Sequence, residues 1–420
     1  MMIRRLVACS FLVSRLFAPA HAPQAPTGPP AADIEIVESV PVGTTLDNPD
    51  VRNAREVWLE MIGRARRTLD LEQYYISNER GKMLEDVLAA IGAAADRGVA
   101  VRFLVDARMY RTYPESADAL GRHRNIEVRR IDFGAIAGSI QHAKYFIVDG
   151  GEIFVGSQNF DWRALEHIHE LGLRVRDGRI AAVYEDVFDL DWQLAALAPE
   201  AAKKFAVARK SYPVPMRIKD TAGNEATIFP TSSPLGFIPD PALWDETAIV
   251  GLIDGAARSL TLQFLSYSPL ERQGGRYGAI DDAVRRAAQR GVKVRLIVSD
   301  WEKGSPAVAA LKELAALANI EVAFTAIPEW TGGYIPFARV EHCKYIVADA
   351  ARFWIGTANG EKSYFHAGRN MGIVGESASL AGTLARIFDR SWTSPYKELI
   401  TPTGTYAPRE HGERPQPAIR

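Results

Sequence analysis

The stretch QHAKYFIVDGGEIFVGSQNFDWR, residues 141–163, decides the fold. Its apolar runs YFIV and EIFVG predict two buried strands that are joined by a short turn. Polar groups surround these runs: a histidine and a lysine two residues apart, then an aspartate, and then Gly-Ser-x-Asn. Because alternate residues of a strand face the same side, we expect His142 and Lys144 to point into one space.

Nearly the same pattern returns in residues 341–359, EHCKYIVADAARFWIGTAN. Seven polar or glycine positions of the first copy have a counterpart 200 residues later. The first set is His142, Lys144, Asp149, Gly156, Ser157, Asn159 and Glu170, and the second set is His342, Lys344, Asp349, Gly356, Thr357, Asn359 and Asn370. Such agreement is not expected by chance, so the chain is predicted to be an internal duplication.

The elements around the motifs repeat as well. RGVAVRFLV (97–105) returns as RGVKVRLIV (290–298), in each case after an apolar-periodic helix. Alternating strands and helices predict an α/β fold of two lobes, each a mixed, mostly parallel sheet with helices on both faces. The expected segments are a leader (1–22), a linker (23–33), a first half (34–200), a crossover (201–224), a second half (225–398) and a flexible tail (399–420).

The composition is that of a globular protein. The 420 residues are 47% apolar and 24% charged, and no later apolar run is long enough to cross a membrane. A net charge of −1 gives no global basic surface, although a local cleft can still be positive. The composition therefore weakens a nucleic-acid substrate without excluding it.

The N-terminus resembles an export signal. Arg4 and Arg5 precede an apolar segment, and Ala20-His21-Ala22 has the small-x-small pattern of a cleavage site. We expect export to the periplasm or the medium; the alternative is a short amphipathic leader. Cleavage would leave Cys343 as the only cysteine, so no intramolecular disulfide is expected in the mature chain.

The repeated motif has a chemical meaning if the halves pack about a pseudo-two-fold axis. Two histidines and two lysines then converge, an arrangement that suits a phosphodiester. One neutral imidazole can attack phosphorus and form a phosphohistidine, while the other protonates the leaving oxygen. The lysines, with Asn159 and Asn359, would stabilise charge on the phosphoryl oxygens. We therefore expect no metal and no cofactor.

Other motif residues receive supporting roles. Asp149 and Asp349 are interpreted as orienting or salt-bridge residues of the catalytic set, and not as proton carriers. Ser157 and Thr357 can donate hydrogen bonds to substrate, with a purely structural role about equally favoured. For Asn159 and Asn359 the alternative to phosphate contact is turn formation. A carboxylate such as Glu170 near one imidazole would orient it and stabilise its cation.

The pattern H-x-K-(x)4-D-(x)6-G-[ST]-x-N resembles the double signature of the phospholipase D superfamily. Further segments resemble one branch of it, that of the third and fourth mammalian phospholipases D. These segments are IVESVPVG (36–43), GSQNFDWRALEHIHELG (156–172), IPFARVEHCKY (335–345) and SWTSPY (391–396). The resemblance implies the phospholipase D fold over residues 34–398, and by analogy His142 as nucleophile with His342 as acid/base. Which histidine Glu170 reaches stays open.

The branch implies two substrate classes. Its mammalian members are membrane-anchored endolysosomal proteins that degrade single-stranded DNA and RNA from the 5′ end, and a lysophospholipid transphosphatidylase role has also been attributed to them. Poxvirus envelope proteins belong to the branch too. This chain departs from the mammalian members in its cleavable-looking leader and its lone Cys343, so its compartment is expected to differ.

Several further residues admit two interpretations. His167 and His169 form an H-x-H pair, but without an evident third ligand they are interpreted as surface residues and not as metal ligands. Phe337 and Tyr364 are expected to contact substrate. Tyr74, Tyr75 and Trp162 could stack on bases or simply pack in the core.

The expected function is a metal-independent phosphodiesterase, acting as a 5′ exonuclease on single-stranded nucleic acid. The alternative is a phospholipase D or transphosphatidylase that acts on phospholipids, as in cardiolipin synthesis. A third class, a non-catalytic membrane- or envelope-associated protein, is disfavoured because both motifs are complete. One chain supplies both motifs, so no obligatory protein partner is expected.

Overall fold

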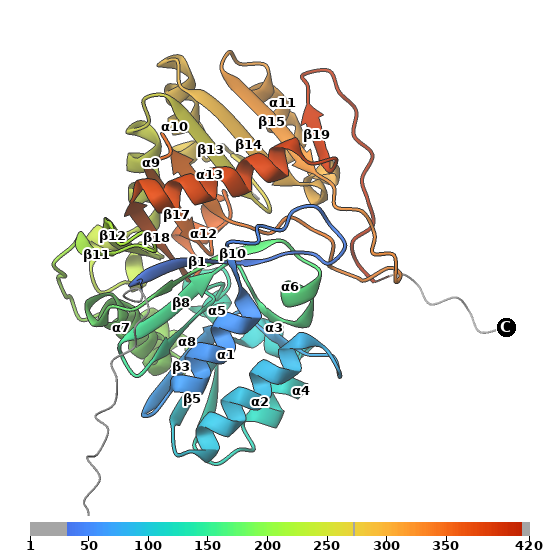
Figure 1. Ribbon diagram of the computed structural model, residues 1–420. Helices are drawn as coiled ribbons and strands as arrows, with labels where there is room; N and C mark the ends of the chain where they lie inside the picture. Colours follow the sequence, from blue (N-terminus) through green and yellow to red (C-terminus); the bar gives the residue numbers. More distant parts are fainter. Residues whose placement is uncertain (1–31, 272–273, 414–420) are drawn as a thin grey trace, which may run out of the picture. The chain divides into compact units, whose positions relative to one another are not determined.

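The computed structural model describes residues 32–271 and 274–413. The expected leader (1–22), nearly all of the expected linker (23–33) and residues 414–420 lie outside the described residues. Within the described part, no helix combines the length and the apolarity that crossing a bilayer requires. Figure 1 colours the first half of the duplication from blue to green and the second half from yellow to red.

The first half is built on an eight-stranded sheet with the order β2-β1-β10-β8-β7-β3-β5-β6. Its strands are β1 (Ile34–Ser39), β2 (Arg52–Asn53), β3 (Thr68–Gln73), β5 (Ala100–Asp106), β6 (Ile126–Ile131), β7 (Tyr145–Val148), β8 (Glu152–Gly156) and β10 (Glu170–Val175). The short strands β4 (Ile76–Ser77) and β9 (Phe160–Asp161) form a separate parallel pair.

Helices cover both faces of this sheet. They are α1 (Ala54–Arg64), α2 (Met83–Asp96), α3 (Ala107–Thr112), α4 (Glu115–Leu120), α5 (Phe133–Ala137), α6 (Trp162–Glu166), α7 (Gly178–Leu194) and α8 (Pro199–Lys203). Side chains alternate between the two faces of the sheet along β7, and this alternation explains why helices cover both faces. Phe146 and Val148 pack in one cluster with α1 and α2, whereas Tyr145 and Ile147 join the cluster that contains α7.

The second half repeats the plan on a nine-stranded sheet with the order β11-β12-β18-β17-β16-β13-β14-β15-β19. Its strands are β11 (Met216–Lys219), β12 (Glu225–Ser233), β13 (Ser259–Phe264), β14 (Lys293–Ser299), β15 (Ile320–Thr325), β16 (Tyr345–Ala348), β17 (Arg352–Gly356), β18 (Asn370–Glu376) and β19 (Lys397–Ile400). β12 begins at the residue expected for the second half, but β11, within the expected crossover, already belongs to this sheet.

The helices of the second half also lie on both faces of their sheet. They are α9 (Asp245–Asp254), α10 (Ala279–Gln289), α11 (Ala307–Ala315), α12 (Lys362–His366) and α13 (Ala378–Thr393), with short 3-10 turns at Leu235–Phe237, Pro241–Leu243 and Asp300–Gly304. Helices α9, α10 and α11 share one apolar cluster with the outer face of the sheet. Helix α13 joins the same central cluster as α7.

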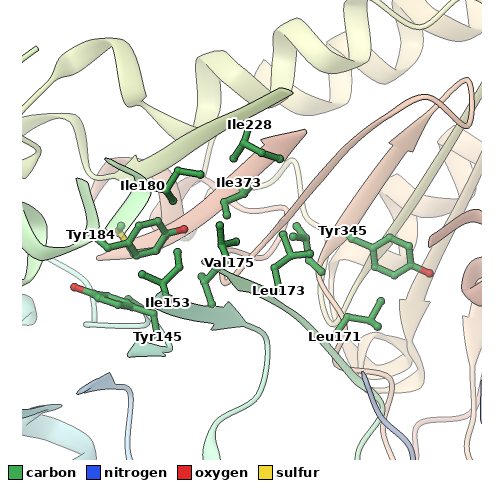
Figure 2. Packing of buried hydrophobic residues seen from close by; sticks show 14 of the residues in the cluster. Tyr145, Ile153, Leu171, Leu173, Val175, Ile180, Tyr184, Ile228, Tyr345 and Ile373 are labelled. Atoms are coloured by element: carbon green, nitrogen blue, oxygen red, sulfur yellow. The ribbon is translucent and has the colours of Figure 1, made fainter. Parts of the chain in front are cut away.

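One apolar cluster therefore joins the two halves. It contains Tyr145 from β7 and Tyr345 from β16, together with side chains of both long helices. Figure 2 shows Leu173 of β10 close to residues of both sheets. The hydroxyl of Tyr184 on α7 donates to the carbonyl oxygen of Gly372 on β18, at 3.1 Å. Because each half buries one sheet face against elements of the other, the duplication forms one continuous core.

The expectation of two mixed sheets with flanking helices is confirmed, but the expectation that they are mostly parallel is wrong. Among the described strands of these two sheets, only the β3-β5-β6 and β13-β14-β15 runs and the β1-β2 pair are parallel. The motif strands form hairpins, β7 with β8 and β16 with β17, and short turns permit only antiparallel pairing.

The expectation of a flexible tail from residue 399 is wrong for residues 399–413. β19 pairs antiparallel with β15 and extends the second sheet. Beyond it, the ring of Tyr406 lies 5.1 Å from that of Phe324, and Arg409 donates to the carboxylate of Asp300. Polar composition concealed this order, because a few specific contacts and not a hydrophobic stripe hold the segment.

Asp149 and Asp349 lie at the far ends of the motif strands and are not part of a catalytic set. Each lies in a turn with positive φ, and a four-residue strand separates it from the histidine and lysine of its motif. The Asp149 carboxylate accepts the backbone N–H groups of residues 66, 67 and 68, which lead into β3. Asp349 does the same for residues 257, 258 and 259 before β13. Both carboxylates therefore cap a loop and fix the start of a central strand.

Replacing Asp149 by Asn should destabilise the fold without changing the chemistry. Burial alone would raise the pKa of Asp149, but the backbone donors outweigh it and lower the pKa below its usual value. The contribution of the carboxylate is thus present at neutral pH and is lost as the pH falls below about 4. We expect urea denaturation at pH 7 to show a loss of about 1 kcal/mol, as for other capping groups, with kcat unchanged.

The exposed Asp47→Asn variant is the matched control for this measurement. A large fall in the kcat of folded Asp149→Asn protein would return this residue to the catalytic set.

Candidate active site

Reciprocal backbone hydrogen bonds join the halves beside the two motif histidines. The N–H of His142 donates to the carbonyl oxygen of Arg369 at 2.9 Å, and the N–H of His342 donates to that of His169 at 3.0 Å. Residues 169 and 369 each donate their own N–H back to the segment just before the histidine. The two exchanges are related by 200 positions, as a pseudo-two-fold axis requires.

The two imidazoles line one cavity of about 440 Å³. Its walls come from both halves and combine the histidines with aromatic, apolar and two arginine side chains. The lining residues are Tyr74, Tyr75, Arg108, Met109, Thr112, Tyr113, Ile140, His142, Asn159, Arg163, Ile168, Leu265, Trp301, Phe337, Val340, His342 and Tyr364. The structure thus brings the predicted histidines together, with both rings nearly buried.

The partner of His142 fixes its tautomer. Nδ1 of His142 lies 3.3 Å from Oδ1 of Asn370, which comes from the other half. The amide of Asn370 cannot be turned round, because its Nδ2 donates to the carbonyl oxygen of Tyr364 at 2.8 Å and Thr357 Oγ1 donates to its Oδ1 at 2.9 Å. Nδ1 of His142 must therefore carry the proton, which leaves the lone pair of Nε2 free.

Burial lowers the pKa of His142 well below its usual value, and the neighbouring Lys144 and Lys344 lower it further. The ring is consequently neutral at physiological pH. The edges of Tyr74 and Tyr364 lie on it, with ring centroids 5.0 and 4.9 Å away, and hold its plane in place. A neutral, oriented imidazole with a free Nε2 lone pair is a competent nucleophile.

His342 has a carboxyl partner instead. Its Nδ1 lies 2.7 Å from Oε2 of Glu170, again across the two halves, so Glu170 reaches the histidine of the second motif. Burial raises the pKa of Glu170 to about 8, although Lys344 opposes this. Burial and the two lysines also lower the pKa of His342. Glu170 and His342 therefore share one proton at neutral pH, because burial disfavours both the ionised carboxylate and the imidazolium.

This shared proton leaves Nε2 of His342 protonated in either form. If Glu170 is the neutral carboxylic acid, it donates to Nδ1 of His342 and the ring proton sits on Nε2. If the carboxylate is ionised, the imidazolium carries protons on both nitrogens. The cavity thus presents a lone pair on one ring and a proton on the other.

Lys144 and Lys344 lie beneath the histidines and are fully buried. Each Nζ donates to the carbonyl oxygen of the histidine two residues earlier, at 2.6 Å. Residues 142–144 and 342–344 lie just before β7 and β16 and outside the strands, so the strand placement predicted for the histidine and lysine of each motif is wrong. Burial lowers the pKa of Lys144 well below its usual value, and Lys344 adds to this. Burial lowers the pKa of Lys344 to about 7. A bound phosphodiester anion would stabilise the charged form of both amines.

Ser157 and Thr357 do not line the cavity, so the prediction that they contact substrate is corrected. Both are fully buried behind the histidine partners. The hydroxyl of Ser157 donates to the carbonyl oxygen of Leu171 and accepts its N–H, at 3.1 and 2.9 Å. Thr357 orients Asn370, as described above. These hydroxyls position Glu170 and Asn370 through the strands that carry them.

The preceding glycine of the motif allows this close strand contact. A Cβ on Gly156 would lie 2.6 Å from Cα of Gly172 and 2.7 Å from the carbonyl oxygen of Leu171. The same clash faces Gly356, where a Cβ would lie 2.8 Å from the carbonyl oxygen of Met371. Glycine is therefore required here by packing and not by chemistry.

The two motif asparagines are no longer equivalent. Asn159 lines the cavity, and its Oδ1 has no hydrogen-bond partner within the protein. Asn359 is fully buried, and its Nδ2 donates to the hydroxyl of Tyr364 at 3.0 Å. Only Asn159 can reach a group in the cavity directly, whereas Asn359 orients a ring of its wall.

Phe337 and Tyr364, which were expected to contact substrate, both line the cavity. Arg108 and Trp301 line the cavity as well, although neither was predicted from the sequence. The positions of these two residues in the sequence could have predicted them. Arg108 follows the carboxyl end of β5 and Trp301 follows that of β14, and these are matching parallel strands in the two halves. Ligands commonly bind at the carboxyl ends of parallel strands.

His167 and His169 are buried, so their interpretation as surface residues is wrong. Nε2 of His169 lies 2.9 Å from a carboxylate oxygen of Glu38, and Nδ1 lies 2.6 Å from one of Glu341. The carbonyl group of His169 receives the backbone N–H of His342, which places this residue in the core.

Among the described residues, one group has the composition of a metal site: His169, Glu341 and Cys343. An ion-pair network accounts for it without a metal. At the equivalent position in the second half, Arg369 forms a buried ion pair with Asp191. Burial opposes protonation of His169, yet Cys343 and Glu341 raise the pKa of the imidazole well above its usual value. Positions 169 and 369 thus both hold a buried cation beside a carboxylate.

Comparison with known proteins agrees with this geometry. The family model described as cardiolipin synthase, PLD-like domain, matches residues 58–192 and 251–392. The chain is 30% identical to the 5′-3′ exonuclease PLD3 of Homo sapiens, over 91% of this chain and 83% of the relative. It is 27% identical to phospholipase D Z of Dictyostelium discoideum, over 88% and 91% of the two chains.

Among solved structures, the fold is similar to that of a phosphatidylserine synthase from Haemophilus influenzae, with a TM-score of 0.62, 11% identity and 87% of both chains covered. At that identity the likeness concerns the fold alone. The family match over both halves, the relatives at 30% identity and the paired motifs agree. The chain therefore belongs to the phospholipase D superfamily.

Proposed function

We propose that this protein is a phosphodiesterase that forms a phosphohistidine on His142, with His342 as acid and base, and that it degrades single-stranded nucleic acid from the 5′ end. One observation carries the chemistry: a single cavity holds a neutral imidazole with a free lone pair and a second imidazole with a transferable proton. These are the two groups that a double displacement at phosphorus needs.

In the first step, Nε2 of His142 attacks phosphorus and a nitrogen–phosphorus bond forms. The bond from phosphorus to the leaving oxygen breaks, and that oxygen takes the Nε2 proton of His342. In the second step, His342 removes a proton from water, whose oxygen attacks phosphorus and displaces His142. Lys144 and Lys344 stabilise the negative charge on the other phosphoryl oxygens in both steps. The lysines supply the positive charge, so the mechanism uses no metal ion.

The substrate class is supported by the relatives and by the cavity walls. A relative at 30% identity is named a 5′-3′ exonuclease, and aromatic rings such as Tyr74, Trp301 and Phe337 offer faces on which unpaired bases can stack. The second candidate is a phospholipase D or transphosphatidylase. The name of the Dictyostelium relative and the apolar wall residues Ile140, Ile168, Leu265 and Val340 favour this alternative.

Export is also part of the proposal. The leader with Arg4, Arg5 and Ala20-His21-Ala22 supports it. Cleavage removes three arginines and changes the formal net charge from −1 to −4. Expression in a bacterial host should yield mature protein that begins at Pro23 in the periplasm or medium, as measured by intact mass. Full-length protein confined to the cytoplasm would argue against export.

The substrate choice can be tested with three substrates in the presence of a chelator: 5′-hydroxyl single-stranded DNA, 5′-phosphorylated single-stranded DNA, and phosphatidylglycerol. We expect stepwise nucleotide release from the 5′-hydroxyl DNA. Replacing His142 or His342 by Ala should lower the rate by about a thousandfold or more. The exposed His123→Ala variant is the matched control and should retain activity.

Release of the phosphatidylglycerol headgroup without DNA cleavage would select the phospholipid alternative. Full activity in both alanine variants would contradict the two-histidine mechanism.

Replacing Glu170 by Gln should change both the rate and its pH dependence. In the wild type, kcat at saturating substrate should fall as the pH rises through about 8, because the proton shared by Glu170 and His342 is then lost. In Glu170→Gln this alkaline limb should move to lower pH, since burial and the lysines lower the pKa of His342 and no carboxyl group remains. We expect kcat at pH 7 to fall by about a hundredfold.

The matched variant is Asn370→Ala, which removes the partner of His142 without removing a titratable group. It should lower kcat but leave the alkaline limb at its wild-type pH. If the alkaline limb of the kcat–pH profile is unchanged in Glu170→Gln, a group other than Glu170 holds the proton.

A further inference from the structure

We propose that the C-terminal segment Arg409–Gly412 supports the rim of the active-site cavity and thereby determines the affinity for a polymeric substrate. The inference rests on the proposed function of that cavity and assigns part of its substrate-binding surface. The rim is defined here as Trp301 and Phe337, which both line the cavity and lie in edge-to-face contact, with ring centroids 6.5 Å apart.

The segment contacts both rim residues directly. The imidazole of His411 lies on the indole of Trp301, with ring centroids 4.9 Å apart and an interplanar angle of 41°. The carbonyl oxygen of the same residue accepts the backbone N–H of Phe337 at 2.5 Å. Gly412 lies near the Phe337 ring, since a Cβ built on this glycine would be 3.7 Å from Cζ of Phe337. One residue of the segment, His411, therefore contacts the ring of Trp301 and the backbone of Phe337.

An ion pair between Arg409 and the buried carboxylate of Asp300 anchors the segment at this place. Nη1 of Arg409 donates to Oδ2 of Asp300 at 2.8 Å and to the carbonyl oxygen of Ile327 at 2.9 Å. The Asp300 side chain is fully buried, and this residue directly precedes Trp301. A buried carboxylate needs such a partner, so Arg409 fixes the segment against the base of the rim.

The backbone of the rim loop needs this external support. Phe337 and Arg339 adopt φ values of +56° and +57°, a conformation that non-glycine residues rarely adopt without stabilising contacts. The hydroxyl of Tyr334, at the start of the loop, donates to the carbonyl oxygen of Gly412 at 2.7 Å. The segment thus holds the loop at both Tyr334 and Phe337.

The exposure of Phe337 indicates what the rim does. Phe337 is 39% exposed to solvent, although it lines the cavity. Arg163 lies 6.0 Å from the ring centroid and adds a cation to this surface. An exposed, fixed aromatic face beside an arginine can bind an unpaired base of a nucleic-acid chain. The segment therefore acts on binding of the chain and not on the phosphorus chemistry at the histidines.

Two truncations test the proposal. A chain that ends at Pro408 loses the segment but keeps β19 and Tyr406, whereas a chain that ends at Glu413 keeps every contact described above. The substrates are a single-stranded oligonucleotide and bis(4-nitrophenyl) phosphate, which has no chain to bind along the rim. We expect the Pro408 truncation to raise KM for the oligonucleotide about tenfold, the order of one lost base–aromatic contact. Turnover of the small diester should match that of the Glu413 chain.

Point variants keep the test valid if the shorter chain folds poorly. His411→Ala removes the ring that supports Trp301, and Tyr406→Phe, which lies between β19 and the segment, is its control. The Tyr406 hydroxyl accepts the N–H of Thr401 and does not reach the rim. His411→Ala should raise the oligonucleotide KM several-fold, and Tyr406→Phe should not.

Unchanged oligonucleotide KM in both the Pro408 truncation and His411→Ala overturns the proposal, as does an equal loss of activity on the small diester. A wild-type protein that hydrolyses the small diester but no oligonucleotide contradicts the proposed substrate class instead. The two failures are therefore distinguishable.

Discussion

The reciprocal backbone bonds between His142 and Arg369 and between His342 and His169 are the constraint on which the site depends. They fix each motif histidine to the strand that carries the partner of its ring. His142 consequently meets Asn370, and His342 meets Glu170, always across the two halves. Neither half contains a complete site. The apolar core that the two halves share holds them together at these bonds.

The same arrangement gathers buried basic side chains at the site. Two lysines and two histidines lie buried there, and burial lowers the pKa values of both lysines. A phosphodiester supplies the missing negative charge. A bound anion of this kind would favour the charged form of both amines.

The sequence predicted the parts of this site that depend on local spacing. The duplication and the convergence of two imidazoles follow from the motif and its repeat 200 residues later. Features set by tertiary contacts were missed. Asp149 shares the motif but caps a distant loop, because β7 separates it from His142. His169 is polar yet lies in the core, since its carbonyl group holds His342. The C-terminal residues look unstructured by composition, but a few specific contacts order them.

The difference between Glu170 and Asn370 has a consequence for how such a fold can evolve. Two identical subunits around a true symmetry axis must give both reactive rings the same neighbour. Fusion into one polypeptide removes that obligation, because each copy can then mutate alone. A single acidic side chain beside one ring and an amide beside the other give the two rings different protonation, a specialisation that a symmetric pair of separate chains could not encode.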